Sequence, residues 1–165
     1  MLEARVHLWE ELVVADIFAG SGSLGFEALS RGALRVHFVE NSANAAKLIR
    51  SNVRQLGLST SRARIAKRDA FRLVRSAPPE KLGLAFIDPP YKKGLLVPFL
   101  DRFLSAGWMQ ESGLIAAEVE QDLAIEPERY DGLELLARKT YGQTRIYLWR
   151  TSACDSQSTR EHSIR

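Results

Sequence analysis

The segment around residue 20 combines glycines and acids in a spacing that suits ligand binding. Gly20-Ser21-Gly22-Ser23-Leu24-Gly25 matches the pattern G-x-G-x-x-G, in which glycines permit a tight turn and let a ligand approach the backbone closely. Asp16 lies just before this turn, where its carboxylate would attract a cation such as an ammonium group and repel a pyrophosphate. Glu40 follows 24 positions after Asp16, near the spacing of an acid that binds ribose hydroxyls. The alternative is a glycine turn that binds no ligand.

Asp69 is a third acid that follows a short apolar run. We expect Asp16, Glu40 and Asp69 to lie near the carboxyl ends of three strands, where open parallel sheets bind their ligands. A nucleoside that carries an amino acid, namely S-adenosylmethionine, suits these acids better than NAD. A nicotinamide oxidoreductase is therefore the weakest alternative, since it leaves Asp16 unexplained.

The segment Asp88-Pro89-Pro90-Tyr91 has the chemistry to bind an amine. The two prolines fix φ and remove two backbone donors, which leaves carbonyl groups that only accept hydrogen bonds. If Asp88 and the Pro89 carbonyl accept the two hydrogens of an exocyclic base amine, its lone pair can be aimed at an electrophilic methyl group. Tyr91 offers a ring on which the base can stack. The alternative is a rigid Pro-Pro turn capped by an acid.

Short apolar runs alternate with helical patterns along most of the chain. We expect strands at 12–18, 35–39, 64–66, 82–87, 113–119, 133–139 and 145–150, and helices at 23–31, 45–56, 71–76 and 95–106. This alternation predicts an α/β fold with a mostly parallel sheet and helices on both faces. The last two strands are separated only by Tyr141-Gly142-Gln143, and such a short connection predicts an antiparallel pair.

The composition of the 165-residue chain excludes several classes of protein. It is 45% hydrophobic, which is too high for disorder, and no stretch approaches the roughly 18 apolar residues of a membrane span. The single cysteine, Cys154, cannot form an internal disulfide, and the spacing of His7, His37 and His162 is unlike that of metal ligands. The N-terminus lacks the layout of a signal peptide. We therefore expect a cytoplasmic protein without a metal or membrane partner.

The middle third of the chain is basic. Residues 41–87 carry 10 Lys or Arg against 2 Asp or Glu, a balance of +8, whereas the whole chain has a net charge of +3. This asymmetry indicates a polyanionic partner, and basic residues between Lys47 and Arg75 could contact phosphates. A solvated helix face balanced by acids elsewhere explains the charge equally well.

Four segments together resemble the RsmD-type family of bacterial methyltransferases. They are the block at 16–33 (DIFAGSGSLGFEALSRGA), Phe38-Val39-Glu40, Asp88-Pro89-Pro90-Tyr91 and Tyr141-Gly142-Gln143. That family transfers a methyl group from S-adenosylmethionine to N2 of a guanine in small-subunit ribosomal RNA. The resemblance implies a Rossmann-like class I methyltransferase fold with a seven-stranded, mostly parallel sheet and an antiparallel closing strand.

The resemblance also assigns roles to particular residues of this chain. It implies cofactor binding by Asp16, Phe18, Ala19, Gly20, Ser21 and Gly22 near the methionine end, by Glu40 and Asn41 near the ribose, by Asp69 and Ala70 near the adenine, and by Asp88. It implies catalytic contacts to the target base from Asp88, Pro89, Pro90 and Tyr91. On this basis we expect a short leader at 1–12, a methyltransferase domain at 13–150 and a polar tail at 151–165.

The resulting hypothesis is a monomeric S-adenosylmethionine-dependent rRNA (guanine-N2)-methyltransferase that acts on ribosomal RNA or a small-subunit particle. Two alternatives remain open. Asp88-Pro89-Pro90-Tyr91 would serve an adenine-N6 DNA methyltransferase equally well. The second alternative is a non-catalytic RNA-binding or assembly protein on a methyltransferase scaffold. It follows from the leader, because only 15 residues precede Asp16 and members of the family usually carry a longer basic segment there.

Overall fold

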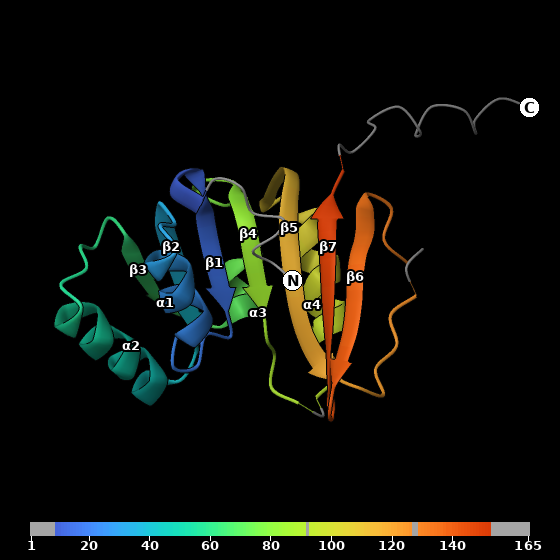
Figure 1. Ribbon diagram of the computed structural model, residues 1–165, viewed down its shortest axis with the longest axis horizontal. Helices are drawn as coiled ribbons and strands as arrows, with labels where there is room; N and C mark the ends of the chain where they lie inside the picture. The colour runs from blue at the N-terminus through green and yellow to red at the C-terminus, as the bar shows by residue number, and fades with distance from the viewer. Residues whose placement is uncertain (1–8, 92, 127–128, 153–165) are drawn as a thin grey trace, which may run out of the picture.

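The computed structural model describes residues 9–91, 93–126 and 129–152. Within them, seven strands form one sheet in the order β3-β2-β1-β4-β5-β7-β6 (Figure 1). The strands are β1 (Val13–Ile17), β2 (Arg35–Glu40), β3 (Ala63–Lys67), β4 (Leu82–Ile87), β5 (Met109–Glu120), β6 (Leu133–Tyr141) and β7 (Thr144–Thr151). The helices are the 3-10 turn η2 (Trp9–Glu11), α1 (Ser23–Ser30), α2 (Ala43–Gln55), α3 (Ala70–Leu73) and α4 (Leu96–Ser105).

Strand β7 is the antiparallel member of this sheet. It pairs antiparallel with both β5 and β6, while the pairs among β3, β2, β1, β4 and β5 are parallel. The carboxyl ends of β1 to β6 therefore meet at one edge of the sheet, the lower edge in Figure 1. The expected α/β fold, its seven strands and its antiparallel closing strand are all confirmed.

Apolar side chains cover both faces of the sheet and separate the helices into two layers. Val14, Val36 and Phe38 pack with α1 and α2 on one face, whereas Ile17 and Ile87 pack with α3 and α4 on the other. Alternation of side chains along each strand produces this division. Strand β4 is buried along its whole length, as expected for a strand covered by helices on both faces.

Most element boundaries lie within two residues of those expected, and the largest difference is at the start of β5. Strand β5 begins at Met109 instead of residue 113, because Met109 already pairs with Leu82 and the polar residues after it form a bulge before Leu114 pairs with Leu84. Strand β7 extends to Thr151, whose Oγ1 donates to the Gln110 carbonyl oxygen at 2.7 Å. Most of the expected tail, 153–165, and most of the expected leader, 1–8, lie outside the described residues.

Candidate functional site

The glycine-rich turn connects β1 to α1 through left-handed backbone conformations. Phe18, Gly20 and Gly22 have φ values of 63°, 54° and 82°, and the Gly22 N–H donates to the Ala19 carbonyl oxygen at 2.7 Å. Glycine adopts this conformation without the steric cost that a side chain adds. Phe18 bears that cost, so the surrounding structure must hold it in place.

Asp16 holds the start of α1 against the sheet. Its carboxylate accepts a hydrogen bond from the Gly25 N–H at 2.9 Å, and the residue is 2% exposed. Gly25 can approach this closely because it lacks Cβ, which would collide with the Phe38 ring and with Val36. Burial raises the pKa of Asp16 to about 7, against the effect of the Gly25 hydrogen bond and with a smaller contribution from the nearby charges of Asp88 and Glu40.

Glu40 links the glycine-rich turn to the end of β2. Its Oε2 accepts a hydrogen bond from the Gly20 N–H at 2.8 Å, and its Oε1 accepts one from the Ser42 N–H at 2.6 Å. A carboxylate has about four acceptor sites, so Glu40 can accept further hydrogen bonds from hydroxyl groups. Asp69 caps α3 in a similar way, because its side chain accepts from the Arg72 N–H at 2.9 Å.

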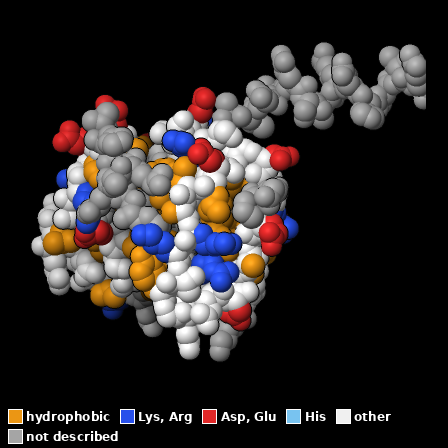
Figure 2. Space-filling model, turned by 45° about the vertical axis from the view of Figure 1, so that its right-hand side comes forward, with side chains coloured by type: hydrophobic (Ala, Val, Ile, Leu, Met, Phe, Trp, Pro, Cys, Tyr) orange, Lys and Arg blue, Asp and Glu red, His pale blue; other side chains and the backbone are white. Residues whose placement is uncertain are grey.

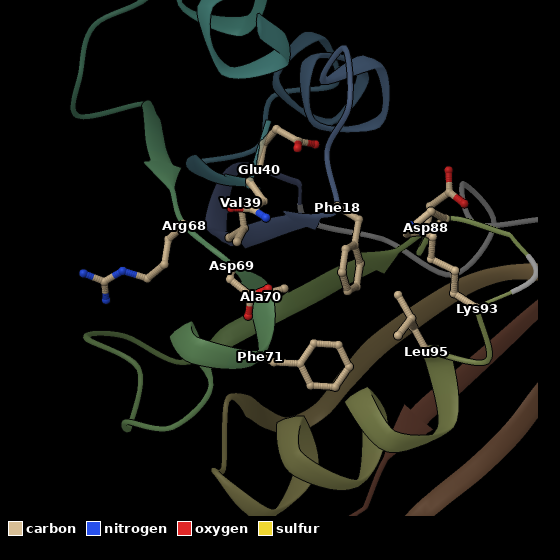
Figure 3. A pocket seen from close by; sticks show the side chains of 12 residues that line it. Phe18, Val39, Glu40, Arg68, Asp69, Ala70, Phe71, Asp88, Lys93 and Leu95 are labelled. Carbon is tan, nitrogen blue, oxygen red and sulfur yellow. The ribbon is translucent and has the colours of Figure 1, made fainter. Parts of the chain in front are cut away.

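A cavity of about 520 Å³ lies at the carboxyl ends of the parallel strands. Its lining residues are Phe18, Val39, Glu40, Asn41, Arg68, Asp69, Ala70, Phe71, Asp88, Pro90, Lys93 and Leu95. In Figure 3 the Phe18 ring projects between Asp88 on one side and Asp69 with Ala70 on the other, while Arg68 points outward. The cavity therefore has acidic groups along its length and aromatic walls from Phe18 and Phe71.

Seven of the residues expected in the site line this cavity, namely Phe18, Glu40, Asn41, Asp69, Ala70, Asp88 and Pro90. The others lie outside the lining: Asp16 is in β1, and the neighbouring turns hold Ala19, Gly20, Ser21, Gly22, Pro89 and Tyr91. Asp16 directs its carboxylate to Gly25. This hydrogen bond ties the first turn of α1 to β1 and so helps to fix the shape of the glycine-rich turn between them.

Asp88 and Tyr91 lie near Glu118 of β5, and Tyr91 also lies near Thr144 of β7; neither partner was predicted from the sequence. The Tyr91 hydroxyl donates to Glu118 Oε1 at 2.7 Å and lies 2.9 Å from Thr144 Oγ1. Burial, together with the negative charge of Glu118, raises the pKa of Asp88 to about 6. Glu118 could have been found by the rule that identified Asp88, because it stands near the carboxyl end of a strand. Phe71, Lys93 and Thr144 carry no comparable signal in the sequence.

The remaining candidates lie elsewhere or have packing roles. His37 Nε2 lies 2.8 Å from Glu80, which also pairs with Arg35 and Arg64. Trp108 and Trp149 are buried in the core. His7, His162 and Cys154 lie outside the described residues. In the part of the chain that the structure describes, no group of three or more His, Cys, Asp or Glu could hold a metal ion, and no helix is long and apolar enough to cross a membrane.

Comparison with known proteins identifies similar chains. The family model described as Conserved hypothetical protein 95 matches residues 1–150. YlbH of Bacillus subtilis is 35% identical over 82% of this chain and 73% of its own length. The ribosomal RNA small subunit methyltransferase D of Haemophilus influenzae is 33% identical over 77% of this chain and 65% of its own length. The chain thus spans about two thirds to three quarters of these relatives.

A solved structure has the same fold. The Haemophilus influenzae protein HI0767 superposes with a TM-score of 0.80 and 30% sequence identity, covering 88% of this chain and 91% of that one. The similarity therefore extends over the sheet, its helices and the edge that carries the cavity.

Proposed function

The chain belongs to the family described as Conserved hypothetical protein 95, and we propose that it is an S-adenosylmethionine-dependent methyltransferase that modifies N2 of a guanine in small-subunit (16S) ribosomal RNA. The observation that carries this proposal is the position of Asp88 and Pro90 at one end of a cavity that Glu40 and Asp69 line further along. The similarity to a ribosomal RNA small subunit methyltransferase D supports the substrate. The resemblance drawn from the motifs is confirmed at the level of the family.

The acceptor groups and aromatic walls of the cavity fit S-adenosylmethionine. Its volume of about 520 Å³ is within the range of small-molecule sites. Glu40 can accept hydrogen bonds from ribose hydroxyls, and Asp69 and Ala70 lie where the adenine would bind, beside the Phe71 ring. Asn41 lies beside Glu40, and the turn formed by Ala19, Gly20, Ser21 and Gly22 would surround the methionine end. When bound, S-adenosylmethionine supplies an electrophilic methyl group on a positively charged sulfur.

Asp88, Pro89 and Tyr91 would hold the target base next to this methyl group. The Asp88 carboxylate and the Pro89 carbonyl accept the two amine hydrogens, so that the nitrogen can pyramidalise and direct its lone pair toward the electrophile. Asp88 then takes the proton that the amine loses. Tyr91 stacks on the base while Glu118 and Thr144 hold its hydroxyl. The target must be an unstacked base, since an amine inside a duplex cannot reach this position.

We expect Glu40→Ala to weaken S-adenosylmethionine binding by about 1–3 kcal/mol, because a charged hydrogen-bond acceptor is lost. Isothermal titration calorimetry measures this change directly. Glu27→Ala is the matched control, since Glu27 is an exposed acid of α1 that pairs with Arg31 away from the cavity. Equal affinities for the wild type and Glu40→Ala would remove Glu40 from the cofactor site.

The rate of methyl transfer should fall as the pH decreases through about 6. The raised pKa of Asp88 means that this group is protonated below about 6 and ionised above it, and only the ionised form is a full hydrogen-bond and proton acceptor. Glu118→Gln removes a neighbouring negative charge and should move the acid limb of the kcat profile to lower pH. Glu134→Gln, on the exposed part of β6, should leave it in place. An unchanged profile in Glu118→Gln would contradict the coupling to Asp88.

An adenine-N6 DNA methyltransferase is the second candidate, because Asp88-Pro89-Pro90-Tyr91 suits either amine. Methyl incorporation into 16S ribosomal RNA and into duplex DNA, measured side by side, separates the two. We expect incorporation into the RNA alone. The RNA substrate also favours a cytoplasmic location, and a monomer suffices because every proposed site residue comes from one chain.

A further inference from the structure

The carboxyl edge of the sheet carries one row of residues that ends in lysine on both sides. On β3, Lys67 pairs with Glu40 of β2, and on β6, Lys139 pairs with Ile146 of β7, which pairs in turn with Glu118 of β5. Asp88 belongs to the same row, because Ile87 is level with Ile17 and Ala117 in the neighbouring strands. The strand order places β4 in the middle, three strands from β3 and three from β6.

Charge is segregated along this row. Its inner positions hold the acids Glu40, Asp88 and Glu118, whereas its two ends hold cations. Lys67 is joined by Arg68 and Arg72, and these three line a hollow of about 670 Å³ together with Asn41 and Asp69. At the opposite end, Arg138 precedes Lys139. Figure 2, which turns the β6 side of the sheet forward, shows Lys and Arg side chains near the middle of that side of the molecule.

These five cations are exposed and free of ion pairs to any residue that the structure describes. Several other basic residues form contacts within the chain, while Lys47, Arg50, Arg54 and Arg75 are exposed but lie outside this row. Arg35 and Arg64 pair with Glu80, and Arg62 donates to the carbonyl oxygens of Leu29 and Ala33. Lys67, Arg68, Arg72, Arg138 and Lys139 are thus available for a ligand at the two ends of the edge that holds the cavity.

We propose that these two groups, Lys67, Arg68 and Arg72 on one flank and Arg138 and Lys139 on the other, bind phosphates of the RNA strand on the two sides of the target nucleotide. Neighbouring strands lie roughly 4.8 Å apart, so each flank is roughly 14 Å from β4 along the sheet. That span corresponds to a few nucleotides of an extended strand. The uncharged base would enter the acidic centre while the phosphates remain at the basic ends.

This inference rests on the proposed function, because it assumes that a base is presented to Asp88. It adds the path of the RNA strand over the protein, which runs along the carboxyl edge of the sheet between β3 and β6. A backbone contact of this kind is independent of sequence and sensitive to salt.

Three double variants test the proposal through binding of a fluorescein-labelled single-stranded RNA of about 16 nucleotides, measured by anisotropy at several salt concentrations. Lys67→Ala/Arg72→Ala removes one flank and Arg138→Ala/Lys139→Ala the other. Each phosphate contact to a single strand contributes about 0.7 to the slope of log K against log salt. We expect each flank variant to lower the magnitude of that slope by about 1 to 1.5 and to bind several-fold more weakly at low salt.

Arg50→Ala/Arg54→Ala is the matched control. These two arginines are equally exposed and line a different hollow beside the start of β3, so the slope should stay at its wild-type value. An unchanged slope in either flank variant, or an equal loss in the control, would overturn the proposal. Calorimetric S-adenosylmethionine binding by the flank variants verifies their fold. Failure of the proposed function would be recognised separately, as an absence of methyl transfer by the wild-type protein.

Discussion

Asp88→Ala is expected to lower the rate of methyl transfer by roughly 10²- to 10³-fold, the loss typical of removing one preorganised polar group from a reacting centre. The carboxylate lies at the end of the cavity nearest Tyr91, where it would accept a hydrogen of the amine and then its proton. Binding of S-adenosylmethionine should change little, because Glu40 and Asp69 provide most of the acceptors further along the cavity. Single-turnover transfer to small-subunit particles, together with calorimetry, measures both quantities.

Asp101→Ala is the control for this substitution. Asp101 is an exposed acid on α4 that pairs with Arg129, so its removal should leave the rate unchanged. Transfer by Asp88→Ala at the wild-type rate would exclude Asp88 from the reaction. A large loss of cofactor affinity would instead assign Asp88 to cofactor binding.

Gly25→Ala is expected to have the largest effect on stability. The added Cβ would collide with the Phe38 ring and with Val36, both of which are fully buried. Overpacking of this kind costs about 1–3 kcal/mol. It would also move α1 away from the sheet, break the hydrogen bond from Gly25 to Asp16 and displace the glycine-rich turn. Chemical denaturation should therefore show a lower free energy of unfolding, and calorimetry a weaker cofactor affinity.

Leu24→Ala provides the comparison one residue away. Leu24 is on the same helix but is 37% exposed, so its truncation leaves the contact between α1 and the sheet intact. We expect a loss of stability well below that of Gly25→Ala. If the two variants are equally stable, close packing of α1 at Gly25 does not support the turn.

The order and type of the elements could be predicted because local patterns determine them. Strand β4 is a continuous apolar run and α2 has one apolar face closed by Gly57, and both occur where expected. The start of β5 could not be predicted, since polar residues 110–112 form a bulge between Met109 and Leu114, and both of these pair with the neighbouring strand β4. The acids Glu40, Asp69 and Asp88 were found because the carboxyl ends of parallel strands meet at one edge.

Contacts between distant segments account for most of what was missed in the site. The hydrogen bond of Asp16 joins residues nine positions apart, and its geometry depends on how closely α1 approaches β2. Glu118 and Thr144 reach Tyr91 from strands 27 and 53 positions further along the chain. A motif read in isolation contains none of these partners.

The basic middle of the sequence shows the same limitation. A balance of +8 indicated a polyanionic partner but did not show which of the basic residues would contact it. In the structure, Arg64 pairs with Glu80, whereas Lys67, Arg68 and Arg72 remain available beside the cavity. Arg138 and Lys139, outside the basic third, complete the arrangement only because β6 returns to the same edge.

The most direct test is the transfer of a tritiated methyl group from S-adenosylmethionine to small ribosomal subunits isolated from a methylation-deficient strain, followed by nucleoside analysis of the 16S RNA. We expect the label in N2-methylguanosine, with incorporation by the wild type and almost none by Asp88→Ala. Label in N6-methyladenosine, or no incorporation by the wild-type protein, would contradict the proposed function.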